Sequence, residues 1–247
     1  MSFDDHVIDH FTQRAGHYNK SSKWVTDQAL GNLLLRLTEP TAADRMLDVA
    51  CGTGLVSRVF AGKVGHLVGL DITPAMFAQA EEVLDEMVVA SAEQMPFEDN
   101  SFDLVVERQG IQFTDDTRSV SEMVRVTRPG GRVCLVQLCA YNDDDRDEYF
   151  EVLRLRNPAR KNFYQREDLA QRLLSAGCSD VAIHDYISVE DVDAWSDNKA
   201  IPEAWREGIR AIYRNATPAF AELHAVSSED GNRFEDHMLF AVAIGRV

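Results

Sequence analysis

Two segments of this 247-residue chain have the residue types of a ligand-binding site. In one, an apolar run typical of a strand is followed by glycines, and in the other such a run ends at a carboxylate. Four of the five residues at 46–50 are apolar, and Cys51-Gly52-Thr53-Gly54 then leads into a predicted helix at 55–61. Glycine allows a positive φ and lets a ligand approach a backbone that carries no Cβ. A second apolar run, 66–70, ends at Asp71. Because an acidic residue there can accept hydrogen bonds from both hydroxyls of a ribose, the two segments predict half of a nucleoside-binding βαβ unit.

The residues around the glycine loop discriminate between two nucleoside ligands. The dinucleotide fingerprint needs a third glycine, and this chain has Ser57 at that position. Asp48, within the first strand, would repel a pyrophosphate but suits an ammonium group. These features favour an amino-acid nucleoside such as S-adenosylmethionine over NAD. An NAD-dependent oxidoreductase stays open as the weaker enzyme alternative, and a tight turn with no ligand is the plain structural one.

Apolar periodicity predicts the elements that hold these segments in place. Residues 3–38 indicate two amphipathic helices around a polar loop, so 1–42 is interpreted as a helical extension that either covers an edge of the sheet or forms a lid. Strands are expected at 46–50, 66–70, 87–90, 102–106, 132–138, 181–187 and 237–244. A helix that starts at Pro74 is expected over 72–84, and Pro129-Gly130-Gly131 is expected as a turn before the fifth strand. Helices between the first five strands predict a parallel sheet with its ligand beyond the carboxyl ends of the strands.

Four motifs in residues 44–139 together resemble the core of a class I S-adenosylmethionine-dependent methyltransferase of the ubiquinone/menaquinone C-methyltransferase-like branch. The motifs are Leu47-Asp48-Val49-Ala50-Cys51-Gly52-Thr53-Gly54, Gly69-Leu70-Asp71-Ile72-Thr73-Pro74-Ala75-Met76, Ala92-Glu93-Gln94-Met95-Pro96-Phe97-Glu98-Asp99-Asn100-Ser101-Phe102-Asp103 and Glu122-Met123-Val124-Arg125-Val126-Thr127-Arg128-Pro129-Gly130-Gly131-Arg132. The resemblance implies a Rossmann-like α/β fold over 43–247, with a doubly wound, seven-stranded, mostly parallel sheet and an antiparallel last strand. It also implies S-adenosylmethionine as cofactor and S-adenosylhomocysteine as product.

The resemblance further implies cofactor-binding roles for individual residues. The glycine loop would hold the methionine portion through Asp48, Ala50, Gly52 and Gly54, with Asp48 near the amino group. Asp71 would hold the ribose hydroxyls.

Other implied contacts lie around the adenine and the methyl group. Ile72 and Met76 would pack on the adenine, and Ala92 and Glu93 would lie near its amino group, since Ser91 replaces the aspartate usual in the family. Gln109 would border the methyl group. Tyr18 resembles an N-terminal aromatic that closes over the cofactor, although a role in the core is an equal alternative.

The segment 188–234 is interpreted as a helical cap inserted between the sixth and seventh strands. The sixth strand exits at the carboxyl ends of the sheet, and a reversed seventh strand must start from the same side, so the insertion is expected over the active-site face. We expect two helices separated by Pro218, with part of the insertion lining the acceptor pocket.

Composition narrows the range of partners and compartments. A net charge of −16 argues against a nucleic-acid backbone as partner. Cys51, Cys134, Cys139 and Cys178 show no paired spacing, so free thiols are expected and no metal site. The acidic N-terminus and the absence of a long apolar run predict a cytoplasmic chain with no membrane span.

Methyl transfer mainly requires near-attack geometry and exclusion of water, with a general base only where the acceptor must lose a proton. Weak catalytic candidates are His17, Tyr18, Gln109 and Tyr141, which the sequence does not rank. The leading hypothesis is methylation of a small or lipophilic metabolite at carbon or oxygen, with a nitrogen acceptor still open. The alternative from another class is a non-catalytic nucleoside-binding or assembly protein on the same fold. The sequence leaves the oligomeric state open.

Overall fold

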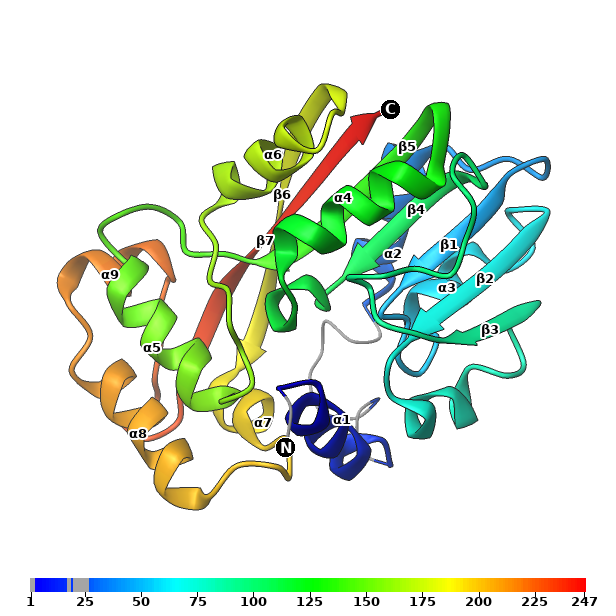
Figure 1. The fold of residues 1–247 in the computed structure, drawn as a ribbon. Helices are drawn as coiled ribbons and strands as arrows, with labels where there is room; N and C mark the ends of the chain where they lie inside the picture. Colours follow the sequence, from blue (N-terminus) through cyan, green and yellow to red (C-terminus); the bar gives the residue numbers. More distant parts are fainter. Residues whose placement is uncertain (1–2, 17–18, 20–26) are drawn as a thin grey trace.

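A computed structural model describes residues 3–16, 19 and 27–247 of the chain (Figure 1). The helices are α1 (Phe3–Arg14), α2 (Gln28–Thr38), α3 (Leu55–Phe60), α4 (Asp116–Val126), α5 (Arg146–Arg156), α6 (Arg166–Ser175), α7 (Val192–Ser196), α8 (Glu203–Arg214) and α9 (Pro218–Leu223), with 3-10 helices η3 (Pro74–Gln79) and η4 (Ile111–Phe113). The strands are β1 (Arg45–Val49), β2 (His66–Asp71), β3 (Glu86–Val89), β4 (Phe102–Arg108), β5 (Thr127–Leu138), β6 (Ser179–Asp191) and β7 (Glu235–Arg246). His17 and Tyr18 lie outside the described residues, so the roles expected of them stay predictions.

The strands within the described residues form a seven-stranded sheet in the order β3-β2-β1-β4-β5-β7-β6. Pairing is parallel from β3 through β5, and β7 runs antiparallel to both of its neighbours, β5 and β6. β6 therefore points in the same direction as β5. This confirms the predicted mostly parallel sheet with an antiparallel last strand.

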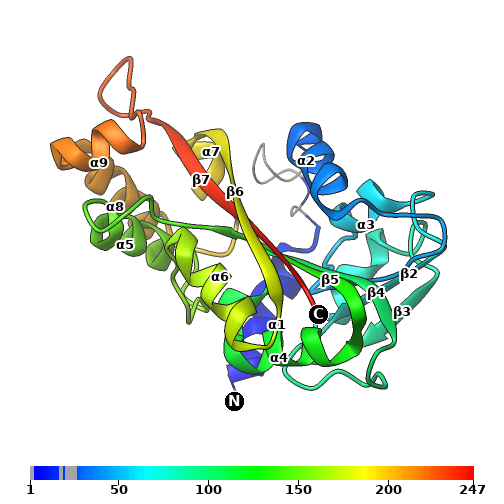
Figure 2. The same cartoon turned by 90° about the horizontal axis from the view of Figure 1, so that it is seen from above.

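Helices cover both faces of the sheet, with α2 and α3 on one face and α4 and α6 on the other (Figure 2). Successive side chains of a strand point to opposite faces, so neighbouring residues of β1 join different cores. The first core includes Leu30, Leu34, Phe60, Met46 and Leu104, and the second includes Val120, Met123, Leu169, Leu47 and Val105. The doubly wound arrangement follows from the strands being apolar on both sides.

Several elements differ in length from the sequence-based expectation. The helix expected to run from 72 to 84 is only the 3-10 helix η3 followed by turns, and β5 begins at Thr127, so it includes the predicted Pro129-Gly130-Gly131 turn. A register shift between Phe102 and Leu104 of β4 accommodates these extra residues. β6 and β7 are longer than expected and stay paired as far as Asp191 and Glu235.

The segment between β6 and β7 folds as α7, α8 and α9, so the expectation of two helices was wrong by one short helix. Pro218 does separate α8 from α9, where it occupies the first turn of α9. These helices pack with α5 at the end of the sheet where β6 ends and β7 begins (Figure 1). Trp195, Ile209 and Phe220 from the insertion are fully buried in this cluster.

A buried histidine links the insertion to the main sheet. His224, just after α9, lies between Asp236 of β7 and Asp145 before α5, with ring nitrogens 2.8 and 3.0 Å from their carboxylate oxygens. All three side chains are fully buried. Burial lowers the pKa of His224 but the two carboxylates raise it, to a net value of about 9, so the imidazole is held as a cation.

Candidate cofactor and acceptor sites

The glycine loop after β1 takes conformations that suit glycine. Gly52 and Gly54 have φ of +55° and +75°, and a Cβ on Gly54 would lie only 2.9 Å from the Cβ of Ala80. A Cβ on Gly52 would lie 3.2 Å from the Cε of Met76. The loop can therefore lie close to η3, and the Gly52 backbone faces a cavity that a side chain would partly fill.

The carboxylate of Asp71 holds this loop against the end of β2. The Gly52 amide donates to Asp71 Oδ2 at 2.8 Å, and the Thr73 amide donates to Oδ1 at 2.7 Å. Burial raises the pKa of Asp71, and these amide hydrogen bonds oppose the shift. The carboxylate is fixed in orientation and still borders the cavity, where its free lone pairs can accept hydrogen bonds.

A cavity of about 680 Å³ lies beyond the carboxyl ends of β1, β2 and β4. Eight residues expected to bind a cofactor line it, namely Ala50, Gly52, Asp71, Ile72, Met76, Ala92, Glu93 and Gln109. Ser91, at the position where the family usually has an aspartate, lines it too. Asp4, Val7 and Phe11 of α1 complete one wall, so the N-terminal helix contributes directly to the cavity.

Two residues that line this cavity have strained backbones. Ala50 and Gln109 have φ of 53° and 59°, a left-handed conformation that is uncommon for residues other than glycine. Such strain is concentrated at ligand sites, where the surrounding structure holds it. The Nε2 atom of Gln109 is buried and has no hydrogen-bond partner among the described residues, although Oε1 accepts from Gln112 at 3.2 Å.

Asp48 is buried within the sheet and does not line the cavity. Its Oδ2 accepts a 2.5 Å hydrogen bond from the hydroxyl of Ser57, the residue that replaces the third glycine. Burial raises the pKa of Asp48 to about 7, against the opposing effects of Ser57 and the Arg108 charge. Its expected contact with a cofactor amino group stays a prediction. Gly54 likewise packs on η3 and does not line the cavity.

A second buried carboxyl, Glu107, lies beside Asp48 at the end of β4. Its Oε1 accepts hydrogen bonds from the amides of Gly110 and Ile111, and Gln137 donates to both of its oxygens at 2.9 Å. Burial raises the pKa of Glu107 to about 7, and the negative charge of Asp48 adds to the shift. Two carboxyls with raised pKa values are therefore connected to the cavity through its lining, since Asp48 lies two residues before Ala50 and Glu107 accepts from the amide of Gly110. Raised carboxyl pKa values are common at functional sites.

An adjoining cavity of about 390 Å³ shares Phe11, Gln109 and Phe113 with the first. It reaches between α1 and α5, and its charged lining residues are Arg14, Arg156 and Arg160. No sequence motif singles out these arginines, which come from the end of α1, the end of α5 and the loop after α5.

The insertion and Tyr141 occupy positions that differ from those expected. None of the residues from 188 to 234 lines either cavity, and the expectation that part of the insertion lines the acceptor pocket stays a prediction. α1 and α5 occupy that place, and the insertion supports it from behind: the carbonyl of Trp195 accepts from Arg156 Nε at 3.1 Å. Tyr141 also lines neither cavity, and its hydroxyl donates to the His237 carbonyl at 2.6 Å.

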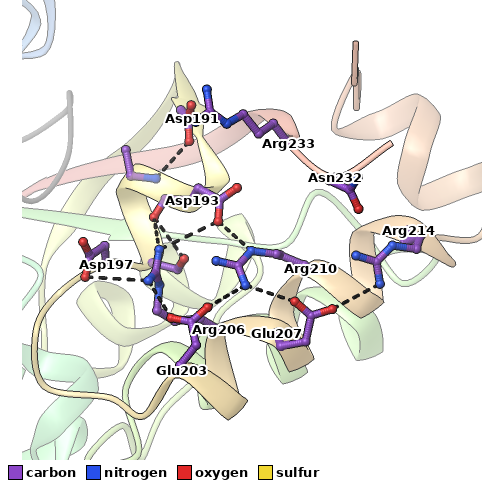
Figure 3. Close-up of polar contacts among 12 residues, drawn as sticks. Asp191, Asp193, Asp197, Glu203, Arg206, Glu207, Arg210, Arg214, Asn232 and Arg233 are labelled. Carbon is purple, nitrogen blue, oxygen red and sulfur yellow. Dashed lines mark hydrogen bonds and ion pairs between the residues drawn. The ribbon is translucent and has the colours of Figure 1, made fainter. Parts of the chain in front are cut away.

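A polar hollow on the outside of the insertion differs from these cavities in its charge pairing (Figure 3). Arg210 contacts Asp193, Glu203 and Glu207 at 2.6 to 3.0 Å, and Arg206 contacts Glu203 at 2.7 Å. These cations and carboxylates are matched within one network that ties α7 to α8. The hollow is thus explained by the packing of the insertion.

The fold is Rossmann-like, and the first cavity lies beyond the carboxyl ends of the parallel strands, which is where folds of this kind bind nucleotides. Residues 47–135 match a family model described as a methyltransferase domain. The chain is similar to the demethylmenaquinone methyltransferase of Clavibacter sepedonicus, with 27% identity over 225 residues that cover 87% of this chain and 86% of that protein.

It is also similar to the uncharacterized methyltransferase YcgJ of Bacillus subtilis, at 32% identity over 60% of this chain and 62% of the relative. The crystal structure of YcgJ shares the fold, with a TM-score of 0.82 over 89% of this chain and 98% of that one, at 20% identity. The matched domain and these relatives support the assignment of the chain as an S-adenosylmethionine-dependent methyltransferase of class I. In the described part of the chain, no helix is long and apolar enough to cross a membrane.

Proposed function

We propose that this methyltransferase transfers the methyl group to carbon or oxygen of a small or lipophilic metabolite. The observation that carries the proposal is the pair of adjoining cavities that share Phe11, Gln109 and Phe113. The first is bordered by a fixed carboxylate and a glycine loop, as a nucleoside requires, and the second is a separate space for an acceptor. The relative named demethylmenaquinone methyltransferase supports a ring-bearing acceptor.

The cavity lining supports a set of cofactor contacts. Asp71 would hold the ribose hydroxyls, because its carboxylate is fixed by two amides and still borders the cavity. Ile72 and Met76 would pack on the adenine, with Ala92 and Glu93 near its amino group. The backbone at Ala50 and Gly52 would hold the methionine portion, and Gln109 would border the methyl group.

S-adenosylmethionine supplies a methyl group on a cationic sulfur, and transfer to an acceptor lone pair leaves the electrons of the broken carbon–sulfur bond on that sulfur. The protein contributes by orienting the acceptor and excluding water. Phe11 and Phe113 supply an apolar wall between the cavities, with ring centroids 5.1 Å apart. The unpaired Nε2 of Gln109 can donate to a bound ligand at this boundary.

We also propose that residues 1–42 act as a lid and that 43–247 form the catalytic domain, with 188–234 as a cap that supports the lid. α1 lines both cavities through Phe11, so displacing this helix would open both of them further to a ligand. The side chain of Thr53 in the glycine loop donates to Asn19 Oδ1 at 2.6 Å. A contact between the extension and the cofactor loop is what a lid requires. The free cysteines support a reducing, cytoplasmic setting.

Calorimetric titration with S-adenosylmethionine, S-adenosylhomocysteine and NAD tests the assignment, after mass spectrometry has shown the protein free of bound ligand. We expect micromolar binding of the two sulfur nucleosides and none of NAD. Binding of NAD alone would favour the oxidoreductase alternative. Failure of all three to bind folded protein would favour a non-catalytic role.

Asp71→Ala tests the ribose contact in the same titration. Loss of two hydrogen bonds to a charged acceptor should weaken S-adenosylhomocysteine binding by about 2 to 4 kcal/mol, or about 30- to 700-fold. Asp85→Ala is a matched control, because Asp85 accepts a backbone hydrogen bond from Leu67 at the opposite end of β2. Equal affinities of the Asp71 and Asp85 variants would show that the ribose lies elsewhere.

A further inference from the structure

The adjoining cavity concentrates positive charge inside an acidic protein. The chain carries a net charge of −16, yet Arg14, Arg156 and Arg160 supply the charged groups of this lining. Arg14 and Arg156 are 3% and 8% exposed. Together with the half-buried Arg160, these two buried guanidinium groups form a site whose potential favours an anion.

The positive charge of the arginines also affects the protonation of His10 in α1. Its Nε2 lies 3.5 Å from Arg14 Nη1. Burial lowers the pKa of His10 to about 3, and the charges of Arg14 and Arg156 add to the shift. The imidazole is therefore neutral at pH 7, and it leaves the positive charge of the cavity to the arginines.

Donor groups in the lining lack partners among the described residues. These buried donor atoms are Arg160 Nη2, Asn157 Nδ2 and Gln109 Nε2. One buried acceptor atom, Gln112 Oε1, also has no hydrogen-bond partner among the described residues. Buried polar groups are nearly always hydrogen-bonded in folded proteins. Unpaired donors are what a ligand with acceptor oxygens would satisfy.

The nearest buried carboxyl does not neutralise the site. Glu107 interacts electrostatically with Arg160, but its hydrogen bonds come from Gly110, Ile111 and Gln137. Because burial raises the pKa of Glu107 to about 7, it carries only part of a negative charge at neutral pH.

We infer that this cavity binds the acidic group of the methyl acceptor, which is therefore a small organic acid bearing a carboxylate or a phosphate. A planar guanidinium with an open Nη2 can form charge-assisted hydrogen bonds to either group. The remainder of the acceptor extends past Phe113 to Gln109, where the two cavities meet. The inference rests on the proposed function, because it takes the neighbouring cavity as the cofactor site.

Substitution of Arg160 tests ligand binding with less disturbance of the fold than substitution of Arg156. Arg156 also supports the fold, since its guanidinium lies 4.3 Å from the centroid of the Trp195 ring and its Nε donates to the Trp195 carbonyl. Arg160 donates through Nε to the Asn162 carbonyl at 2.9 Å and lies 5.4 Å from the centroid of the Phe163 ring, while its buried Nη2 has no hydrogen-bond partner among the described residues. Arg160→Gln removes the charge while leaving the Arg156 contacts in place, and Arg160→Lys keeps the charge without the planar fork.

The experiment uses protein saturated with S-adenosylhomocysteine and titrates benzoate, 4-hydroxybenzoate, phenyl phosphate, and benzamide as the neutral match of benzoate. We expect at least one acid to bind tenfold or more tightly than benzamide. Arg160→Gln should weaken the binding of that acid at least tenfold, and Arg160→Lys should have an affinity between those of wild type and Arg160→Gln. The affinity for S-adenosylhomocysteine should not change in either variant. Arg214→Gln is the control, because Arg214 is paired with Glu207 on the outer side of α8. Comparing the affinities of the two carboxylates with that of phenyl phosphate shows whether the site prefers a carboxylate or a phosphate.

Two results distinguish the failures. If S-adenosylhomocysteine binds but the acids bind no better than benzamide, or bind Arg160→Gln as well as wild type, the anion site is wrong and the methyltransferase proposal stands. If S-adenosylhomocysteine itself fails to bind folded protein, the proposed function is wrong. Retained S-adenosylhomocysteine affinity in Arg160→Gln also shows that this variant is folded.

Discussion

Cofactor binding is expected to release protons from the two buried carboxyls beside the glycine loop. Asp48 and Glu107 lie on neighbouring strands, where Val49 of β1 pairs with Glu107 of β4. Burial raises the pKa of each to about 7, so each holds about half a proton at pH 7. S-adenosylmethionine brings a sulfonium and an ammonium, and positive charge near a carboxyl favours its ionised form.

The size of the effect follows from proton linkage. A ligand that lowers one of these pKa values from about 7 to about 5 binds about tenfold more tightly at pH 8 than at pH 6, and releases about half a proton at pH 7. The sign is fixed because the free protein holds the protons, so affinity rises with pH. S-adenosylhomocysteine lacks the sulfonium charge and should show a smaller rise.

Calorimetry at pH 7 in two buffers with different ionisation enthalpies measures the protons released. We expect wild-type protein to release between about half a proton and one proton, and Asp48→Asn to release about half a proton less. Asp44→Asn is the control, because hydrogen bonds from Thr41 and the Arg132 ion pair outweigh burial and keep the pKa of Asp44 low, so this residue is already ionised. Equal proton release by wild type and Asp48→Asn, or affinity that falls with pH, would refute the reasoning.

Two further predictions concern the insertion and the glycine loop. His224→Ala should lower the free energy of unfolding by about 3 to 5 kcal/mol, since it leaves two buried carboxylates without their cation. In wild type the pKa of His224 is raised from 6.5 to about 9, so its contribution to stability is complete below pH 6.5 and disappears as pH rises through about 9. Urea midpoints that stay level from pH 6.5 to 9.5 would contradict this prediction. Gly54→Ala should cost more stability than Gly62→Ala, by about 1 to 3 kcal/mol, because both have positive φ but only Gly54 has a neighbour, Ala80, within 4 Å of the added Cβ; equal thermal midpoints would show that the loop can relax.

The sheet could be predicted because its information is local. Strands buried on both faces carry continuous apolar runs, and the glycines and Asp71 mark the loops where the chain turns toward its ligand. The errors also have local causes. Pro74 allowed a helix start, but only a 3-10 turn follows before β3, and the Pro129-Gly130-Gly131 turn was absorbed into β5 through a register shift.

The acceptor cavity could not be predicted in the same way, because its residues meet only in the folded chain. Arg14 comes from α1, while Arg156 and Arg160 lie about 140 residues later and have no periodic signal. The absence of residues 188–234 from the lining of this cavity has a related reason. Topology places that segment at the correct end of the sheet, but α5 packs between it and the cavity, and only tertiary packing decides which helix is inside.

The side chains that line the two cavities have opposite charge, and this difference orients the two ligands. The cofactor side is lined by Asp4, Asp71 and Glu93, which suit a cation, whereas the acceptor side contains arginines that suit an anion. Each ligand is therefore stabilised in one cavity and disfavoured in the other. Because Gln109 lies at the shared wall, the acceptor's anchored acid fixes which of its atoms reaches that boundary. An acceptor anchored by its acid presents a different atom at this boundary, and a hydroxyl or carbon there must still lose a proton. The charge pattern thus specifies the orientation of the acceptor before the chemistry of the methylated atom is known.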